Sequence, residues 1–407
     1  SQSMIRLIVL SLVLTTSLQA LDWPRFLGPD GKSYSTETGI NKDWTANPPK
    51  ELWRRNMSDG GYGGPVVVAG VVYIQDHKNG QEVLLALDQK SGKELWRHSF
   101  KEAKEHKFGL TRTTPLVQNG VIYTISSLGT VTAVTIRTQE RLWQTKRFTE
   151  GELPKWQVSN SPIIDNGRLL TMTAGKNALL TGLHLETGKT IWQGGGTDQL
   201  GYATPAIGTI NGTKQYIAFS GKSIRGVDPI SGDIIWSMDW PTKYDVNGST
   251  PFIISDDGVL VTSGYRNKTA LLKIKGHSCK IVWENKKINT RFSSPIFYKG
   301  HIYTTTEPRF IVCFDPYTGK EKWRTTSSNE IGVGHGALTG VDDVLIALSD
   351  MDGSVIMARM TPDSYQELGR IQPFEEKQSW TAPVVANKKL LVRSKSALVC
   401  LDLSASN

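Results

Sequence analysis

The chain has 407 residues, of which 38% are apolar and 21% are charged, and this balance excludes an intrinsically disordered chain. The 47 basic and 38 acidic residues give a net charge of +9, but Lys and Arg are scattered and never form a run of five, so we do not expect nucleic acid as a partner. Three cysteines without a CxxC pair exclude a disulfide framework and a zinc site.

The N-terminal segment has the pattern of a secretory signal. Arg6 precedes the apolar run 7–14, and a short polar stretch then ends at the small residue Ala20. The run is too short to span the ~30 Å hydrocarbon core of a bilayer, and no later segment is long enough to do so. We therefore predict a signal peptide over residues 1–20, with residues 1–3 as a remnant ahead of Met4; a membrane anchor is the alternative. The mature protein is expected to be exported, and periplasmic or extracellular.

Beyond residue 50 the sequence repeats with a period near 45 residues. The first marker is a tryptophan that recurs every 40 to 49 residues, and Leu368 takes the eighth place, 45 residues after the last of them. These tryptophans are Trp53, Trp96, Trp143, Trp192, Trp236, Trp283 and Trp323. The second marker recurs every 42 to 50 residues and comprises Pro65, Pro115, Pro162, Pro205, Pro251, Pro295, Ala337 and Pro383. Two independent markers with the same period indicate a repeat fold.

Each repeat unit is predicted to form four short antiparallel strands. In the second unit, strands are expected over residues 114–117, 121–125 and 130–136, and a short fourth strand ends at Trp143. The first two are joined by Asn119-Gly120, a strong signal for a tight hairpin because both residues accept positive φ. Four antiparallel strands every ~40–45 residues are typical of a β-propeller blade.

The recurring tryptophan is interpreted as a structural residue. A four-stranded blade cannot bury both of its faces alone, so it must pack against its neighbours, and a large side chain at a fixed place fills the gap between them. Truncation of such a side chain should cost about 3–5 kcal/mol. We do not expect the whole set to stack against a cofactor.

The order of the two markers predicts how the ring closes. Trp53 precedes the first proline marker, whereas the strands that follow Pro383 end near residue 402 without a tryptophan. The last unit therefore lacks a fourth strand, which we expect the segment around Trp53 to supply. The prediction is an all-β, eight-bladed propeller of four-stranded antiparallel blades over residues 50–403, with an N-terminal extension at 21–49 and a tail at 404–407. The seventh blade deviates, because Ala337 and Leu368 replace its markers.

The cysteines fit this frame. Cys313 and Cys400 both stand two residues before an Asp, at equivalent core positions of the sixth and eighth blades. Such positions are too far apart for a disulfide. Cys279 falls at a turn. All three are expected to be free thiols.

A motif recurs where the third and fourth strands of a blade are joined. It reads Ala-x-Asp-x-x-Ser-Gly-Lys-x-x-Trp over residues 86–96 and Asp-x-x-Thr-Gly-Lys-x-x-Trp over 315–323. This motif resembles the blade motif of pyrroloquinoline-quinone-type propellers, and the resemblance covers residues 50–403. That superfamily includes quinoprotein dehydrogenases and the non-enzymatic propeller lipoprotein of the outer-membrane protein assembly machine. The start of the extension, residues 22–33, looks like that of exported bacterial proteins named only for this repeat.

The resemblance implies a fold and, for some members, a chemistry. The dehydrogenases hold the quinone with a bound calcium, a nearby catalytic Asp and a ring of two adjacent cysteines. This chain has no adjacent cysteines and no Asp, Asn and Glu cluster that matches the calcium site. We therefore expect no cofactor; pyrroloquinoline quinone with calcium belongs to the alternative in which the protein is such a dehydrogenase.

Candidate site residues lie where the chain enters each innermost strand, because those loops surround the mouth of the central channel. The candidates for binding a ligand or partner are Tyr62, Arg112, Trp156, Tyr202, Tyr244, Arg291, Phe292, His335 and Trp380. Aromatic side chains with Arg and His around one mouth suit an anionic or planar ligand or a peptide; the alternative is that they simply fill the channel. His335 is the best candidate for chemistry, although a single His is more often structural, and no catalytic residue is assigned.

Two connections between blades, 97–112 and 144–158, are longer than the others. The first is rich in cations, among them Lys101, Lys104 and Lys107. Long loops on adjacent blades suggest a patch for a partner or ligand; a merely solvated loop is the alternative.

These observations favour a binding protein. We expect an exported, non-enzymatic, monomeric propeller that presents its channel mouth and inter-blade loops to a protein or polymer partner in the cell envelope. A pyrroloquinoline-quinone-dependent dehydrogenase is the first alternative, and an enzyme that acts on polysaccharide is the second.

Overall fold

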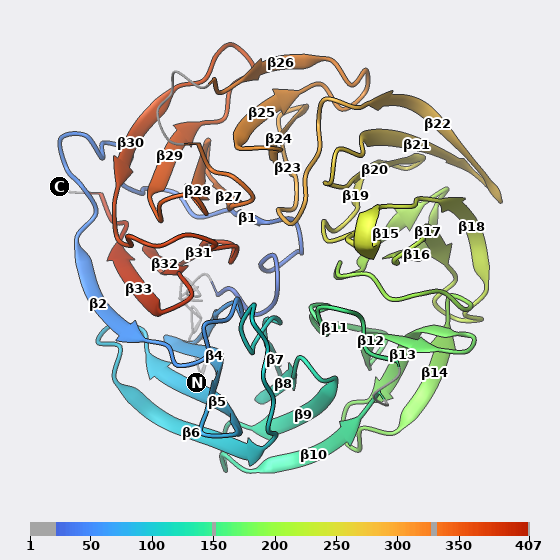
Figure 1. The fold of residues 1–407 in the computed structure, drawn as a ribbon, viewed down its shortest axis with the longest axis horizontal. Coiled ribbons are helices and arrows are strands. Elements are labelled where there is room, and N and C mark those ends of the chain that lie inside the picture. The colour runs from blue at the N-terminus through green and yellow to red at the C-terminus, as the bar shows by residue number, and fades with distance from the viewer. Residues whose placement is uncertain (1–21, 149–151, 327–331, 406–407) are drawn as a thin grey trace, which may run out of the picture.

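The computed structural model describes residues 22–148, 152–326 and 332–405. Eight sheets, each with four antiparallel strands, surround a central axis, which confirms the predicted eight-bladed β-propeller (Figure 1). The predicted signal peptide, residues 1–20, lies outside the described residues. No helix in the described ranges is long and apolar enough to cross a membrane.

The strands follow one another from the channel to the rim in each of the first seven blades. Blades one and two comprise β3 (Val66–Val68), β4 (Val71–Lys78), β5 (Gln81–Asp88), β6 (Glu94–Lys101), then β7 (Leu116–Gln118), β8 (Val121–Ile125), β9 (Thr130–Thr135) and β10 (Arg141–Lys146). Blades three and four comprise β11 (Ile163–Asp165), β12 (Arg168–Gly175), β13 (Ala178–His184), β14 (Thr190–Gly194), then β15 (Ala206–Ile210), β16 (Thr213–Phe219), β17 (Ser223–Val227) and β18 (Ile234–Asp239). A short 3-10 helical turn, η2 (Lys243–Asp245), follows β18 in the chain.

The second half of the ring repeats this order. Blades five and six comprise β19 (Phe252–Ser255), β20 (Gly258–Thr262), β21 (Thr269–Lys275), β22 (Ser278–Asn285), then β23 (Ile296–Tyr298), β24 (His301–Thr306), β25 (Phe310–Phe314) and β26 (Glu321–Arg324). Blades seven and eight comprise β27 (Ala337–Val341), β28 (Val344–Leu348), β29 (Val355–Arg359), β30 (Glu367–Ile371), then β31 (Val384–Ala386), β32 (Lys389–Arg393), β33 (Ala397–Asp402) and, from the other end of the chain, β2 (Glu51–Asn56).

The two ends of the chain close the ring as predicted. Strand β2 pairs antiparallel with β33, and Trp53 stands opposite Cys400 (Figure 1). The N-terminal segment thus becomes the outermost strand of the blade that the C-terminus builds. This pairing leaves no open gap between the first and last blades.

Each fourth strand carries a β-bulge at the same place. In seven blades the register shifts by one residue immediately before the tryptophan, for example between Glu51 and Trp53, so that the residue between them has no partner across the strand. A bulge increases the local twist and redirects the side chain that follows it. The repeated bulge therefore sets the direction of the tryptophan side chain that follows it.

Trp53, Trp143 and Trp283 dock on the glycine of the neighbouring blade's motif, whereas Trp236 lies against Gly226 of its own blade. Trp53 is buried, and its Nε1 donates a hydrogen bond to the carbonyl of Gln89 at 2.7 Å. Its ring lies against Gly92, where an added Cβ would overlap the indole. Trp143 and Gly188 make the same contact. The structural interpretation of the tryptophans is therefore confirmed, and the motif's glycine is explained by the same packing.

Blade seven departs from the prediction by one residue and uses a tryptophan from elsewhere. Its bulge places Gly369, not Leu368, at the tryptophan position. Trp44, from the N-terminal extension, packs on Gly369 and lies in a core with residues of blades seven and eight. The extension thus supplies the indole that this blade lacks. The repeat spacing pointed to Leu368. It gave no sign of Trp44, because a side chain from a distant segment leaves no periodic signal.

The start of the N-terminal extension crosses the centre of the ring (Figure 1). Trp23 forms an antiparallel bridge with Val67 of β3, and the amide of Val117 in β7 donates to the carbonyl of Pro24 at 2.9 Å. The short strand β1 (Tyr34–Ser35) then pairs parallel with β27, so that blade seven has a fifth strand on its channel side. The extension therefore ties together the innermost strands of three blades.

All three cysteines are free thiols, as predicted. Cys313 and Cys400 are buried in blade cores. Cys279 is not in a turn: it pairs with Ile274 near the start of β22. Blade five joins its third and fourth strands through Gly276-His277 alone, so the motif's longer loop is missing and the position falls inside the strand.

Candidate ligand site at the centre of the ring

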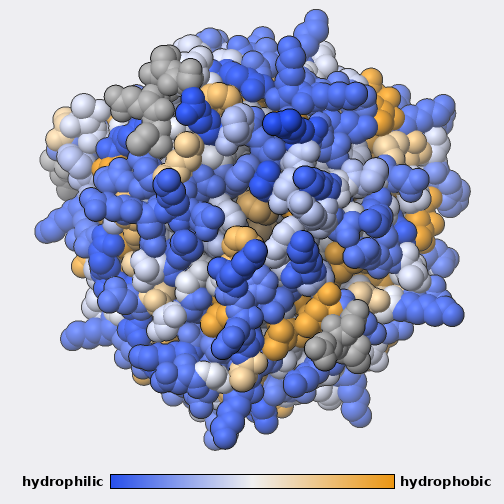
Figure 2. All heavy atoms as spheres, viewed as in Figure 1, coloured by the Kyte–Doolittle hydropathy of each residue, from blue (hydrophilic) through white to orange (hydrophobic). Residues whose placement is uncertain are grey.

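The central channel contains a cup of about 440 Å³, within the range of ~300–1,000 Å³ that is usual for ligand sites. Loops that lead into the innermost strands line its sides. Trp23, Phe26, Leu27 and Ser33 of the N-terminal extension also line it. Because these residues sit across the innermost strands, the channel is a blind cup and not an open pore. In the space-filling view of the ring, hydrophilic residues cover most of the visible face (Figure 2).

The structure brings the candidate residues together. The cup is lined by Tyr62, Arg112, Trp156, Tyr202, Arg291, Phe292, His335 and Trp380, which come from loops of seven blades. Tyr244 does not line the cup but lies at its rim, where it is 48% exposed and contacts Trp156 edge-on at 5.6 Å between ring centroids. Their role in binding stays a prediction.

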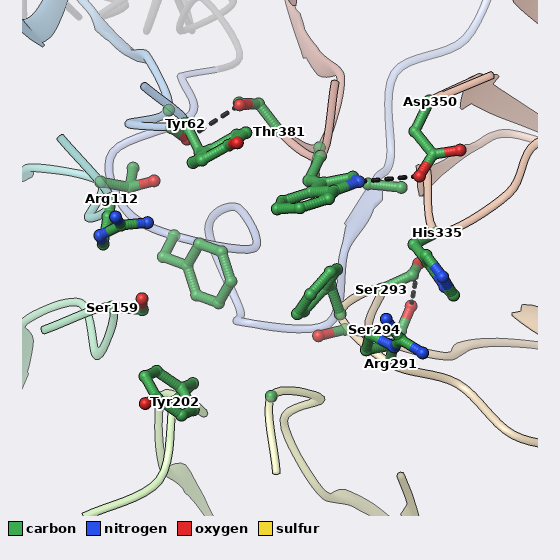
Figure 3. A pocket seen from close by; sticks show the side chains of 18 of the residues that line it. Tyr62, Arg112, Ser159, Tyr202, Arg291, Ser293, Ser294, His335, Asp350 and Thr381 are labelled. Atoms are coloured by element: carbon green, nitrogen blue, oxygen red, sulfur yellow. Dashed lines mark hydrogen bonds between the residues drawn. The ribbon is translucent and has the colours of Figure 1, made fainter. Parts of the chain in front are cut away.

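One wall of the cup is a ladder of aromatic rings. Tyr62 stacks on Trp380 with centroids 4.7 Å apart and planes at 18°. Trp380 contacts Phe292 at 4.7 Å, and Phe292 meets His335 edge-on at 6.0 Å. Each ring fixes the next, so the wall is rigid and apolar. The indole Nε1 of Trp380 is the polar end of this ladder and donates to Asp350 Oδ2 at 2.8 Å (Figure 3).

A second aromatic cluster lies at the rim. Tyr244 is 5.6 Å from both Trp156 and Tyr265, measured between ring centroids, and Trp156 contacts Tyr202 at 6.0 Å. Tyr244 and Tyr265 have φ angles of 60° and 55°, in the left-handed region that large side chains disfavour. Such backbone strain persists only where the surroundings enforce it, and it concentrates at functional sites.

Arg291 is a cation whose charge is already balanced. Its guanidinium lies 3.8 Å from the ring centroid of Tyr265, and its Nε contacts Glu307 Oε1 at 2.8 Å. The ion pair is partly buried, which holds the planar side chain in place against the ring. Arg291 therefore shapes the wall and adds little net charge to the cup.

Arg112, on the opposite side of the cup, has only neutral partners among the described residues (Figure 3). Its Nη2 bonds to His106 Nδ1 at 2.9 Å and to the carbonyl of Gly109 at 3.1 Å, and the guanidinium lies 5.9 Å from the ring centroid of Tyr62. Its Nε is buried without a hydrogen-bond partner in the described structure. Burial lowers the pKa of Arg112, and Tyr62, Tyr202 and Asp59 oppose the shift without cancelling it; the carboxylate of Asp59 is itself paired with Arg393.

His335 lies beside Asp350 and Arg291 in the cup (Figure 3). Burial, and after it the positive charge of Arg291, lowers the pKa of His335, while Asp350 opposes the shift. The imidazole is therefore neutral at neutral pH and can either donate or accept a hydrogen bond. A catalytic role for it stays a prediction.

Sequence reasoning did not select several cup residues. These are Trp23, Phe26, Leu27, Ser33, Phe108, Tyr265, Ser294, Asp350 and Gln378. Phe108 lies in the first long connection, which the sequence did single out. Ser294 and Gln378 lie in loops that lead into innermost strands but away from the position that the sequence analysis selected, and the others reach the cup from the N-terminal extension or from the ends of second strands.

The first long connection is not the exposed basic patch that its sequence suggested. Strand β6 extends to Lys101, so the first part of the segment belongs to blade one. The side chain of Lys104 is 2% exposed, pairs with Glu82 and lies 3.8 Å from Glu102 Oε1. Lys104 therefore holds the loop down and is not available to a partner, whereas Lys101 and Lys107 are exposed.

The described residues do not fit a calcium-held quinone. Asp350 is the one carboxylate among the residues that line the cup, and it already accepts the Trp380 hydrogen bond. The three cysteines lie in strands of blades five, six and eight, outside the cup. Within the described ranges no three His, Cys, Asp or Glu side chains are grouped so as to hold a metal ion.

Fold and site together define the class: an eight-bladed, tryptophan-docked β-propeller with a blind, aromatic and partly cationic cup on its axis. Its sequence then gives the family. The chain belongs to the family of the outer membrane protein assembly factor BamB, whose sequence profile matches residues 45–195, 152–325 and 220–407.

Individual relatives agree on the fold. A quinoprotein alcohol dehydrogenase, PedH of Pseudomonas putida, is 26% identical over 224 residues, which are 48% of this chain and 36% of that protein. BamB from Moraxella catarrhalis superposes with a TM-score of 0.63 at 15% identity, over 87% of this chain and 100% of that one. The quinohemoprotein alcohol dehydrogenase from Comamonas testosteroni gives 0.70 at 12% identity, over 95% and 81%. The chain thus spans about a third of the curated relative's length.

Proposed function

We propose that this protein is a non-enzymatic binding propeller of the cell envelope, whose cup receives part of a protein or polymer partner. The observation that carries the proposal is the blind cup. The chain's own N-terminal extension lines it, and an aromatic wall, a rim cluster and Arg112 face into it. A pocket of this size with few polar groups on rigid elements suits the capture of one end of a partner.

Two further features support the proposal. The family is named for an outer membrane assembly factor, which favours an envelope partner and an exported protein. The chain also carries a net charge of +9, which favours anionic partners at a cell surface. A monomer suffices for this role, because one chain builds the whole cup.

Site-specific photo-crosslinking tests the proposal. Ser159 lines the cup, and a photoreactive residue placed there should form an adduct with one envelope component. The same residue placed at Ile230, which is 85% exposed on the outer rim, is the control and should not form it. Trp380→Ala should abolish the Ser159 adduct because the aromatic ladder then loses its central ring. The same adduct at both positions, or none at Ser159, would count against the proposal.

A quinone-dependent dehydrogenase is the second candidate. The relative from Pseudomonas putida is a quinoprotein alcohol dehydrogenase, and a quinohemoprotein alcohol dehydrogenase shares the fold; both observations favour this candidate. The carboxylates and cysteines described above do not favour it, since they do not form the calcium and disulfide arrangement of those enzymes. The two candidates differ in one measurement, the retention of pyrroloquinoline quinone with calcium, which only a dehydrogenase should show.

A further inference from the structure

The cup is electrically polarised across its width. Arg112 stands on one side, where its hydrogen-bond partners among the described residues are neutral and the nearby carboxylate of Asp59 is already paired with Arg393. Asp350 stands on the other side, fixed by the indole of Trp380 (Figure 3). On the same side as Asp350 and His335, Arg291 is neutralised by Glu307 (Figure 3). A matching ligand therefore carries an anionic group at one end and hydrogen-bond donors at the other.

Buried hydroxyl groups in the wall also lack partners. Ser294 is 7% exposed, lines the cup, and its Oγ has no hydrogen-bond partner among the described residues. The hydroxyl of Tyr62 is likewise buried and without a partner in the described ranges. Neither oxygen is exposed to the cup, so both are a cost of the wall's own packing and offer a ligand no contact.

The aromatic surface continues beyond the cup. Trp156 lines the cup and contacts Tyr244, which is 48% exposed at the rim. A small free ligand would need no platform outside the pocket. A chain whose terminal unit enters the cup would lie across that platform with its next unit, since the blind end does not let the chain pass through.

We propose that the cup binds the terminal uronic-acid residue of an acidic oligosaccharide. The carboxylate binds Arg112, the ring packs between the aromatic side chains, and ring hydroxyls donate to Asp350. The next sugar lies on Trp156 and Tyr244. The proposal rests on the proposed function and names the class of partner: Arg112 and Asp350, on opposite sides of the cup, then each meet a complementary group on the ligand.

Titration calorimetry with oligosaccharides of equal length tests it. A galacturonate tetramer should bind, and a neutral galactose tetramer should bind at least about tenfold more weakly, because it lacks the charge-assisted hydrogen bonds to Arg112. Arg112→Gln should weaken the acidic tetramer about 10- to 100-fold and leave the neutral one unchanged. Binding of the acidic tetramer should also weaken as salt is raised.

Arg147→Gln is the matched control. Arg147 is also half-buried with a pKa lowered by burial, but it does not line the cup, so its replacement should change neither affinity. Equal affinity for both tetramers, an unchanged Arg112→Gln variant, no binding at millimolar sugar, or preference for a peptide with a C-terminal carboxylate would each overturn the proposal. If the Ser159 adduct forms while the tetramer does not bind, the binding function stands and the sugar assignment fails.

Discussion

Trp44 is predicted to be a structural member of the ring, although it stands outside the repeats. Its side chain is 2% exposed and lies in the core between blades seven and eight. Truncation of a buried Trp leaves a large cavity and should cost about 3–5 kcal/mol of unfolding free energy. We therefore expect Trp44→Ala to destabilise the propeller as much as the loss of a tryptophan from a repeat.

Gly369, on which Trp44 packs, allows a more specific test of this contact. Its φ is not positive, so the backbone alone tolerates alanine there. An added Cβ would, however, overlap the Cβ of Trp44. Gly369→Ala should therefore cost about 1–3 kcal/mol in the natural protein, and about the same in the Trp44→Ala background, because alanine keeps the Cβ that the new methyl group meets. In a Trp44→Gly background, which lacks that Cβ, Gly369→Ala should be neutral or stabilise by up to about 1 kcal/mol. Gly369→Ala and Trp44→Gly should therefore be strongly non-additive.

Urea unfolding followed by circular dichroism measures the four proteins of the cycle between Trp44→Gly and Gly369→Ala, together with Trp44→Ala. Leu142→Ala is the control: Leu142 is 44% exposed at the bulge of β10, and its truncation should stay within about 0.5 kcal/mol. The reasoning is refuted if Trp44→Ala is no more destabilising than Leu142→Ala. Additive effects of the two changes would refute the contact between Trp44 and Gly369.

Three other predictions follow from the structure. Burial raises the pKa of Glu82 to about 7 against the attraction of Lys104, so the folded protein retains a proton that the unfolded chain has lost above about pH 4.5, and the contribution of Glu82 to stability falls as pH rises toward 7. Unfolding measured between about pH 5 and pH 8 should show a weaker fall in stability for Glu82→Gln. Glu94→Gln is the control and should leave the fall unchanged, because the Glu94 carboxyl has a lowered pKa and is already ionised. Gly92→Val should cost at least about 2 kcal/mol in thermal unfolding, because φ is +72° and the new side chain meets the indole of Trp53; a smaller cost would contradict the docking role of the motif's glycine. Incubation with pyrroloquinoline quinone and calcium, followed by gel filtration, should leave no quinone absorbance on the protein, and retained quinone with dye-linked alcohol oxidation would favour the dehydrogenase.

The sequence by itself determined the fold. Blade number, strand order, the ring closure at Trp53 and the free cysteines all follow from signals that repeat every ~45 residues, because each blade folds from contiguous residues and meets its neighbours in the same way. The position of the candidate residues around one mouth follows from the same periodicity, since loops at equivalent places in a ring face the same axis.

Only the tertiary structure decided what fills the centre and the deviant blade. The extension lines the cup through Trp23 and supplies Trp44 to blade seven, and neither contact repeats, so no periodic signal marks it. The charge of Arg112 and the burial of Lys104 were likewise invisible, because both depend on which side chains lie nearby in space. Contacts that occur once between distant segments are encoded by shape and charge complementarity, which a linear pattern does not display.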